Sequence, residues 1–144
     1  MNLSEHFTLD ELTVSETAAR KGLDNIPDND ALMNLRRLAL FLEKVRAVLN
    51  KPIKINSAYR SPKVNASVGG SKTSQHCLGC AADIRVGGLT PDQVVKLVVK
   101  SDLKYDQVIR EFDSWVHISI PNNETLKPRK QALIIDKSGV RPYA

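Results

Sequence analysis

The chain has 144 residues, of which 42% are hydrophobic and 26% are charged, and its formal net charge is +5 at pH 7. This composition is typical of a globular protein in water, the length suits a single domain over residues 1–144, and no apolar run is long enough for a membrane span. A basic protein is attracted to polyanions, but the basic residues are scattered and aromatic residues make up only 5%, so the sequence predicts no nucleic-acid partner.

The N-terminal part of the chain predicts short helices rather than a targeting signal. The opening residues contain neither a positively charged region nor an apolar run, so we expect a protein that is made in the cytoplasm. Residues 7–21 predict two short helical turns, in which Thr8 caps the first, Ser15 opens the second and Gly22 closes it. His6 has no partner in this pattern and is not interpreted as a metal ligand.

A long amphipathic helix follows between the turn signals at residues 27–30 and 50–52. Its apolar residues recur at three- and four-residue spacing, and they are Leu32, Leu35, Leu38, Ala39, Leu42, Val45 and Leu49. Charged residues occupy the other face, so this helix is expected to be a scaffold.

The alternating run 53–56 predicts a strand, and residues 61–74, rich in Ser, Gly and Asn, predict a long loop with one helical turn. Such a loop is typical of a substrate-binding wall.

The second half of the chain alternates between strands and one helix. The predicted elements are a strand at 84–86, a helix at 90–101, a hairpin of 108–112 and 115–120 joined by Asp113–Ser114, and a last strand at 132–135. The order of elements predicts an α+β fold, in which the N-terminal helices pack on one face of a small antiparallel sheet.

The residues with the clearest chemistry lie in the stretch 74–84. His76 is followed seven positions later by Asp83, with small residues between them that allow close backbone approach. A second histidine, His117, lies far downstream in an alternating strand pattern. Two histidines and one carboxylate are a typical catalytic zinc set, in which the fourth position stays open for water.

A longer motif surrounds these residues. Ser74, His76, Gly79, Ala81 and Asp83 read S-x-H-x-x-G-x-A-x-D, and W-V-H follows at 115–117. This pattern resembles the zinc D-Ala-D-Ala carboxypeptidase family, which includes dipeptidases and phage endolysins and shares a fold with the hedgehog signalling domain. The runs 3–12 and 57–62 also match, so the resemblance covers nearly the whole chain. It implies a hedgehog/DD-peptidase-like domain of the single-domain phage and bacterial branch, with one Zn²⁺ bound by His76, Asp83 and His117.

The motif leaves the general base open. Many members of the family carry Glu three residues before the second histidine, a position that Ser114 occupies here. The closer branch resembles E-F-x-x-W-V-H, which implies Glu111 as the catalytic residue. Asp113 is the second candidate for the base. The alternative for Glu111 is that it is only a solvated strand carboxylate near Arg110.

The length of the hairpin loop distinguishes these alternatives for Glu111. A two-residue loop pairs Glu111 with Val116 and turns it away from His117. A three-residue loop pairs Glu111 with Trp115 and directs it toward the metal face.

Other residues of the motif have two interpretations each. The resemblance implies that Arg60 binds a substrate carboxylate or the developing oxyanion, whereas a surface ion pair is the alternative. Ser74 either hydrogen-bonds the substrate or caps the turn into His76. Cys77 and Cys80 form a C-x-x-C, but no second pair completes a structural zinc site, so we interpret them as two small buried or half-buried thiols.

The expected function is that of a monomeric zinc peptidase that hydrolyses peptide bonds of bacterial peptidoglycan. A phage-type endolysin, released to the cell wall through a holin-made lesion, fits the resemblance and the absence of a signal. A non-catalytic zinc module that binds wall peptide or a protein partner is the alternative from another class. The sequence leaves open which bond is cut: D-Ala-D-Ala, the D-Ala-diaminopimelate cross-link or L-Ala-D-Glu.

Overall fold

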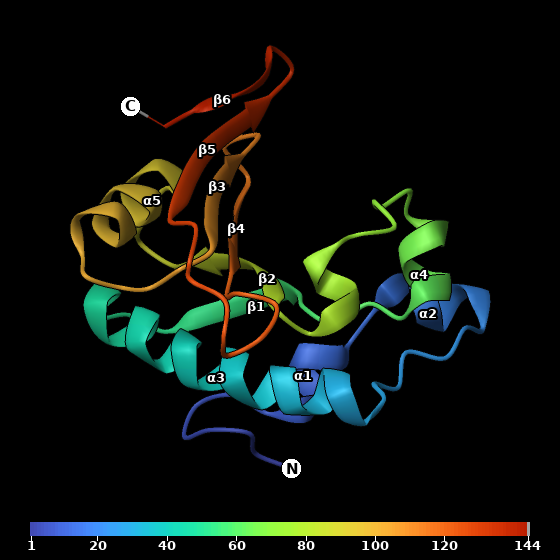
Figure 1. The fold of residues 1–144 in the computed structure, drawn as a ribbon. Coiled ribbons are helices and arrows are strands. Elements are labelled where there is room, and N and C mark those ends of the chain that lie inside the picture. Colours follow the sequence, from blue (N-terminus) through green and yellow to red (C-terminus); the bar gives the residue numbers. More distant parts are fainter. Residues whose placement is uncertain (144) are drawn as a thin grey trace.

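The fold is shown as a computed structural model in Figure 1, and the structure describes residues 1–143. The elements in chain order are α1 (Leu9–Thr13), α2 (Glu16–Lys21), α3 (Asn29–Leu49), β1 (Ile53–Ser57), α4 (Pro62–Ser67), the 3₁₀ helix η1 (Gln75–Leu78), β2 (Ala81–Val86), α5 (Pro91–Lys100), β3 (Gln107–Glu111), β4 (Trp115–Ser119), β5 (Gln131–Asp136) and β6 (Gly139–Pro142). No helix in this part of the chain is long and apolar enough to cross a membrane.

The helix ends lie where the capping residues predict them. Thr8 caps α1 in a reciprocal capping box with Glu11, and Ser15 caps α2, which ends at Gly22 in the left-handed conformation. The Asp28 side chain accepts a hydrogen bond from the Ala31 N–H and starts α3. These boundaries confirm the sequence prediction, because each cap depends on residues only a few positions apart.

The hydrophobic core lies between the helices and one face of the sheet. The predicted apolar face of α3 is buried at Leu35, Leu38, Leu42 and Val45, although Leu32 is only partly buried. α5 packs against β2, β3 and β4, whereas α3 packs against α5 and η1, and α1 packs against β1. In Figure 1, α5 lies beside the upper strands and α3 runs across the base of the fold. The prediction that the N-terminal helices cover the sheet is therefore incomplete, because α5 covers its central strands.

The sheet has the strand order β1-β2-β4-β3-β5-β6. Its neighbours are antiparallel except for β3 and β5, which are parallel, so the predicted antiparallel sheet is in fact mixed. The reason is geometric: β4 ends beside the start of β3, and residues 120–130 carry the chain around that same end before β5 begins. β6 was not predicted from the sequence, because its residues are all exposed and lack an apolar alternation.

The N-terminal segment is tied to α3 by a carboxylate. Glu43 Oε2 accepts hydrogen bonds from Ser4 Oγ and from the His6 N–H, each at 2.6 Å. His6 Nδ1 lies 2.6 Å from the other carboxylate oxygen of Glu43. The expectation that His6 has no partner is therefore wrong, because its partner lies 37 positions away in the chain and no local pattern reveals it.

Candidate metal site

The turn η1 holds the first candidate ligand in place. Ser74 Oγ accepts a hydrogen bond from the His76 N–H, so Ser74 caps the turn, as one of its two interpretations predicted. Gly79 ends the turn with φ of +79°, and a Cβ at this position would lie 2.6 Å from the carbonyl oxygen of Ala31 on α3. Only glycine combines this conformation with such close packing, which is the physical reason for the glycine in the motif.

The His76 ring is fixed by a backbone carbonyl. Its Nδ1 lies 2.6 Å from the Ala58 oxygen, and because a carbonyl only accepts, Nδ1 carries the hydrogen. The lone pair of Nε2 is then free, and Nε2 lies 3.4 Å from Asp83 Oδ1. The ring is buried, with 3% of the residue exposed. A second hydrogen bond of this kind is usual for a metal-binding histidine, because it fixes the tautomer and the ring orientation.

Strand register brings the other two candidates together. β2 begins at Ala81, earlier than predicted, so Asp83 lies inside the strand and pairs directly with His117 of β4. His117 Nδ1 lies 3.1 Å from Asp83 Oδ1. Burial raises the pKa of Asp83, but the contacts of its carboxylate with His117 and His76 outweigh burial and hold the pKa well below its usual range.

The three side chains fit a zinc ion. One ligand atom from each of His76, Asp83 and His117 lies within 4.8 Å of the others. Tetrahedral zinc with bonds of about 2.0–2.2 Å places its ligand atoms about 3.3–3.6 Å apart. The two separations from Asp83 Oδ1, 3.1 Å to His117 Nδ1 and 3.4 Å to His76 Nε2, are close to that spacing. Two imidazole lone pairs and one carboxylate also form the donor set that catalytic zinc prefers.

The cluster lies in an open hollow of about 400 Å³ on the sheet face opposite α5. Its lining consists of Arg60, Ser71, Thr73, Ser74, Gln75, His76, Asp83, Gln107, Ile109, Glu111, Trp115 and His117. The loop before η1 forms one wall, as the sequence predicted, and the floor comes from β2, β3 and β4. Gln107 and Ile109 were not predicted as site residues, although the period-two alternation of β3 places them on the same face as Glu111.

Arg60 lies beside the metal cluster. Its backbone N–H donates to the His76 oxygen at 3.1 Å, which brings the arginine next to η1. None of the ion pairs formed within residues 1–143 involves Arg60, and its Nε is buried without a hydrogen-bond partner there. The alternative of a surface ion pair is therefore wrong, and the guanidinium remains available to a ligand.

Glu111 occupies the position that a three-residue hairpin loop gives it. It pairs with Trp115 across the hairpin and lines the hollow with His117. The turn is closed by a 2.9 Å hydrogen bond from the Ser114 N–H to the Glu111 oxygen, with Phe112 and Asp113 in the left-handed region. Burial raises the pKa of Glu111, and the neighbouring Asp83 carboxylate raises it further.

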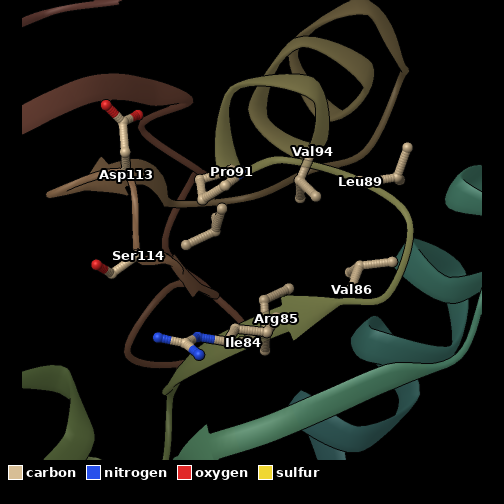
Figure 2. Close-up of a pocket in the computed structure, with 9 residues that line it drawn as sticks. Ile84, Arg85, Val86, Leu89, Pro91, Val94, Asp113 and Ser114 are labelled. Atoms are coloured by element: carbon tan, nitrogen blue, oxygen red, sulfur yellow. The ribbon is translucent and has the colours of Figure 1, made fainter.

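Asp113 lies away from the metal cluster. It is 72% exposed, and its carboxylate forms an ion pair with Arg110 Nε at 3.0 Å. With Ser114 it lines a separate hollow of about 280 Å³, whose apolar walls include Pro91 and Val94 of α5 (Figure 2). Since α5 covers the other face of the sheet, the structure separates Asp113 from His76, Asp83 and His117.

The two cysteines are not part of the cluster. Cys77 is half-buried and Cys80 is buried, as expected, and both are free thiols. Burial raises the pKa of each thiol, so each ionises less readily than an exposed cysteine.

The model of the family described as peptidase M15 matches residues 5–119. The matched segment contains all three candidate ligands as well as Arg60 and Glu111. A search of curated proteins found no match.

Proposed function

The chain belongs to the peptidase M15 family and is a metallopeptidase, and we propose that it is a zinc enzyme that hydrolyses peptide bonds of bacterial peptidoglycan. The observation that carries this proposal is the arrangement of His76, Asp83 and His117 in one open hollow with Glu111 and Arg60. An acid–base group and an anion-binding group beside a metal cluster are what peptide hydrolysis requires.

In this proposal each of the three ligands presents one atom to the ion. His76 presents Nε2 because Ala58 accepts the hydrogen of Nδ1, and His117 presents Nδ1 beside Asp83. Zinc bound there would lower the pKa of a water molecule toward about 7 and polarise the scissile carbonyl.

Glu111 acts as the general base in this proposal. Its carboxylate lies on the same sheet face as His117 and Asp83, where it accepts a proton from the attacking water and passes it to the leaving amine. A carboxyl whose pKa is raised by burial holds that proton better than an exposed one, which suits a group that must both accept and donate it.

Arg60 supplies the positive charge of the substrate site. Its guanidinium, which forms no ion pair with residues 1–143, suits a carboxylate of the stem peptide or the oxyanion that develops on the scissile carbonyl. Ser74 lines the same hollow, but its Oγ already caps η1, so we assign it a secondary contact with substrate.

We assign the enzyme to the phage-type endolysins, as a monomer that acts on the wall after release from the cytoplasm through a membrane lesion. The net charge of +5 supports this assignment, because a basic protein adsorbs to an anionic cell wall. The open form of the hollow also suits a cross-linked polymer better than a small free peptide.

Digestion of purified sacculi tests the proposal. The zinc-loaded protein should release muropeptides with new amino termini, and mass spectrometry of these products identifies the bond that is cut. His117→Ala should release none, whereas His6→Ala is the matched control, because it removes a histidine that lies outside the hollow. Wild-type protein that binds zinc and sacculi but releases no product would refute the enzyme and favour the non-catalytic module.

A further inference from the structure

A second cluster of polar side chains lies next to the metal site, centred on Asp106. This residue is only 4% exposed. Its Oδ2 accepts hydrogen bonds from Arg129 Nη2 at 2.6 Å, Arg129 Nε at 3.0 Å and Gln75 Nε2 at 3.1 Å. Its Oδ1 accepts the backbone N–H of Arg129 at 3.0 Å. Such a nearly buried carboxylate is stable only while these donors stay in place.

Gln75 links this cluster to the metal site, because it directly precedes His76 in η1. Its Nε2 lies among three acceptors, which are Asp106 Oδ2, the Ile120 oxygen at 2.9 Å and Asn122 Oδ1 at 2.8 Å. The backbone oxygen of Gln75 accepts the Cys80 N–H at 3.0 Å. The amide side chain thus ties the first residue of the turn to the segment that follows β4.

The turn depends on such external contacts. A single 3₁₀ turn has few and poorly aligned hydrogen bonds of its own, so its position is set by what it contacts. The Ala58 oxygen fixes the ring of His76. Gln75 fixes the backbone next to His76 through separate contacts with Asp106 and the Ile120 oxygen.

The arginine of this cluster comes from outside the segment that matches the family. Arg129 lies in the connection of residues 120–130, whereas the match ends at residue 119. The connection is held at its end by two backbone hydrogen bonds, from Lys130 N to the Tyr105 oxygen and from Gln131 N to the Asp106 oxygen. The C-terminal segment therefore contributes a charged group to the support of η1.

We propose that Gln75, Asp106 and Arg129 are positioning residues that hold the turn bearing His76, and that they thereby set the affinity of the metal site. The proposal rests on the zinc site of the proposed function. In this proposal the segment beyond the family match has a role in the site. Arg129 fixes Asp106, Asp106 fixes Gln75, and Gln75 fixes the backbone next to His76.

Zinc affinity and the visible spectrum of the cobalt-substituted protein test this proposal. Gln75→Leu and Arg129→Met should each raise the zinc dissociation constant about tenfold or more in a chelator competition, the usual size of such supporting contacts. The cobalt absorption bands should shift or weaken in both variants, since they report ligand geometry. Arg129→Lys retains the positive charge but loses the planar guanidinium that donates two hydrogen bonds to Asp106. It should therefore bind zinc more tightly than Arg129→Met but less tightly than the wild type.

Arg141→Met is the matched control. Arg141 forms a two-point ion pair with Asp136, both contacts at 2.9 Å, on the C-terminal hairpin and away from η1. It should leave zinc affinity and the cobalt spectrum unchanged. If Gln75→Leu and Arg129→Met lower only the unfolding temperature and keep the wild-type affinity and spectrum, the positioning role is refuted while the zinc site stands. A wild-type protein that binds no zinc would instead refute the proposed function.

Discussion

Replacing Gly79 by alanine would test whether the packing of η1 on α3 controls the metal site. Gly79 has φ of +79°, and the added Cβ would lie 2.6 Å from the Ala31 oxygen and 3.1 Å from Leu35 Cγ. An ordinary contact begins near 3.4 Å, so η1 and α3 must separate by about 0.8 Å to accept the methyl group. The turn that carries His76 would have to make most of this movement, because α3 is a long helix whose apolar face is packed in the core.

Two free-energy costs determine how much stability Gly79→Ala should lose. The left-handed conformation costs an alanine about 1–2 kcal/mol. Forcing a methyl group into a packed contact costs about 1–3 kcal/mol more. The free energy of unfolding should therefore fall by about 2–5 kcal/mol, a large part of the stability of an ordinary domain.

Gly22→Ala separates the two terms. Gly22 has φ of +64°, but a Cβ there would meet no atom within 4 Å. This variant should lose only the conformational term and keep normal zinc affinity. Urea unfolding of the metal-free proteins measures both losses, and a zinc titration measures the effect on the site. Equal losses in the two variants, with equal zinc affinity, would refute the argument that the approach of η1 to α3 matters.

Three further predictions concern the chemistry of the site and its supports. Glu111→Gln should keep zinc but lose at least about a hundredfold in sacculus hydrolysis, whereas Asp113→Asn should lose little; the reverse result would transfer the role of base to Asp113. The double variant Cys77→Ser, Cys80→Ser should keep its zinc in elemental analysis, because the ligand set is complete without thiols. Loss of the metal in this variant would show that Cys77 or Cys80 is a ligand. The pKa of Asp106 is lowered, because hydrogen bonds from Arg129 outweigh the effect of burial. The ionised carboxylate therefore contributes its full stabilisation of the folded state above the unfolded pKa of about 3.9, and this contribution disappears as the pH falls through the folded pKa. The stability difference between metal-free wild type and Asp106→Asn should therefore shrink in urea titrations below about pH 4, and a difference that stays constant would contradict this assignment.

The local features of the fold were predictable from the sequence because their causes are local. Thr8, Ser15 and Asp28 cap helices whose first turns lie within three residues of them. The apolar spacing of α3 and the turn signals around it likewise need no distant partner. The resemblance that the motif carries also implied that His76, Asp83 and His117 would meet, and the structure brings one ligand atom of each within 4.8 Å of the others.

The features that the sequence did not show depend on distant contacts. β5 is parallel to β3 because of the path of residues 120–130 around the end of the sheet, which no periodicity records. His6 pairs with Glu43 of α3, and Arg129 pairs with Asp106, each across more than 20 positions. Gln75 belongs to the motif stretch, yet its three acceptors come from segments that only the folded chain brings together.

The hairpin between β3 and β4 shows how one residue of loop length can decide the chemistry of a site. Strand alternation places Trp115 and His117 on the same face of β4. A three-residue loop pairs Glu111 with Trp115, so the carboxylate shares the face of the metal ligands, whereas a two-residue loop would have placed it on the face that α5 covers. Phe112 and Asp113 of this three-residue loop adopt left-handed backbone, although neither is glycine. The 2.9 Å bond from the Ser114 N–H to the Glu111 oxygen and the 2.8 Å bond from the Phe112 N–H to the Ile135 oxygen stabilise it. β5 thus helps to fix the loop that directs Glu111 toward the metal site.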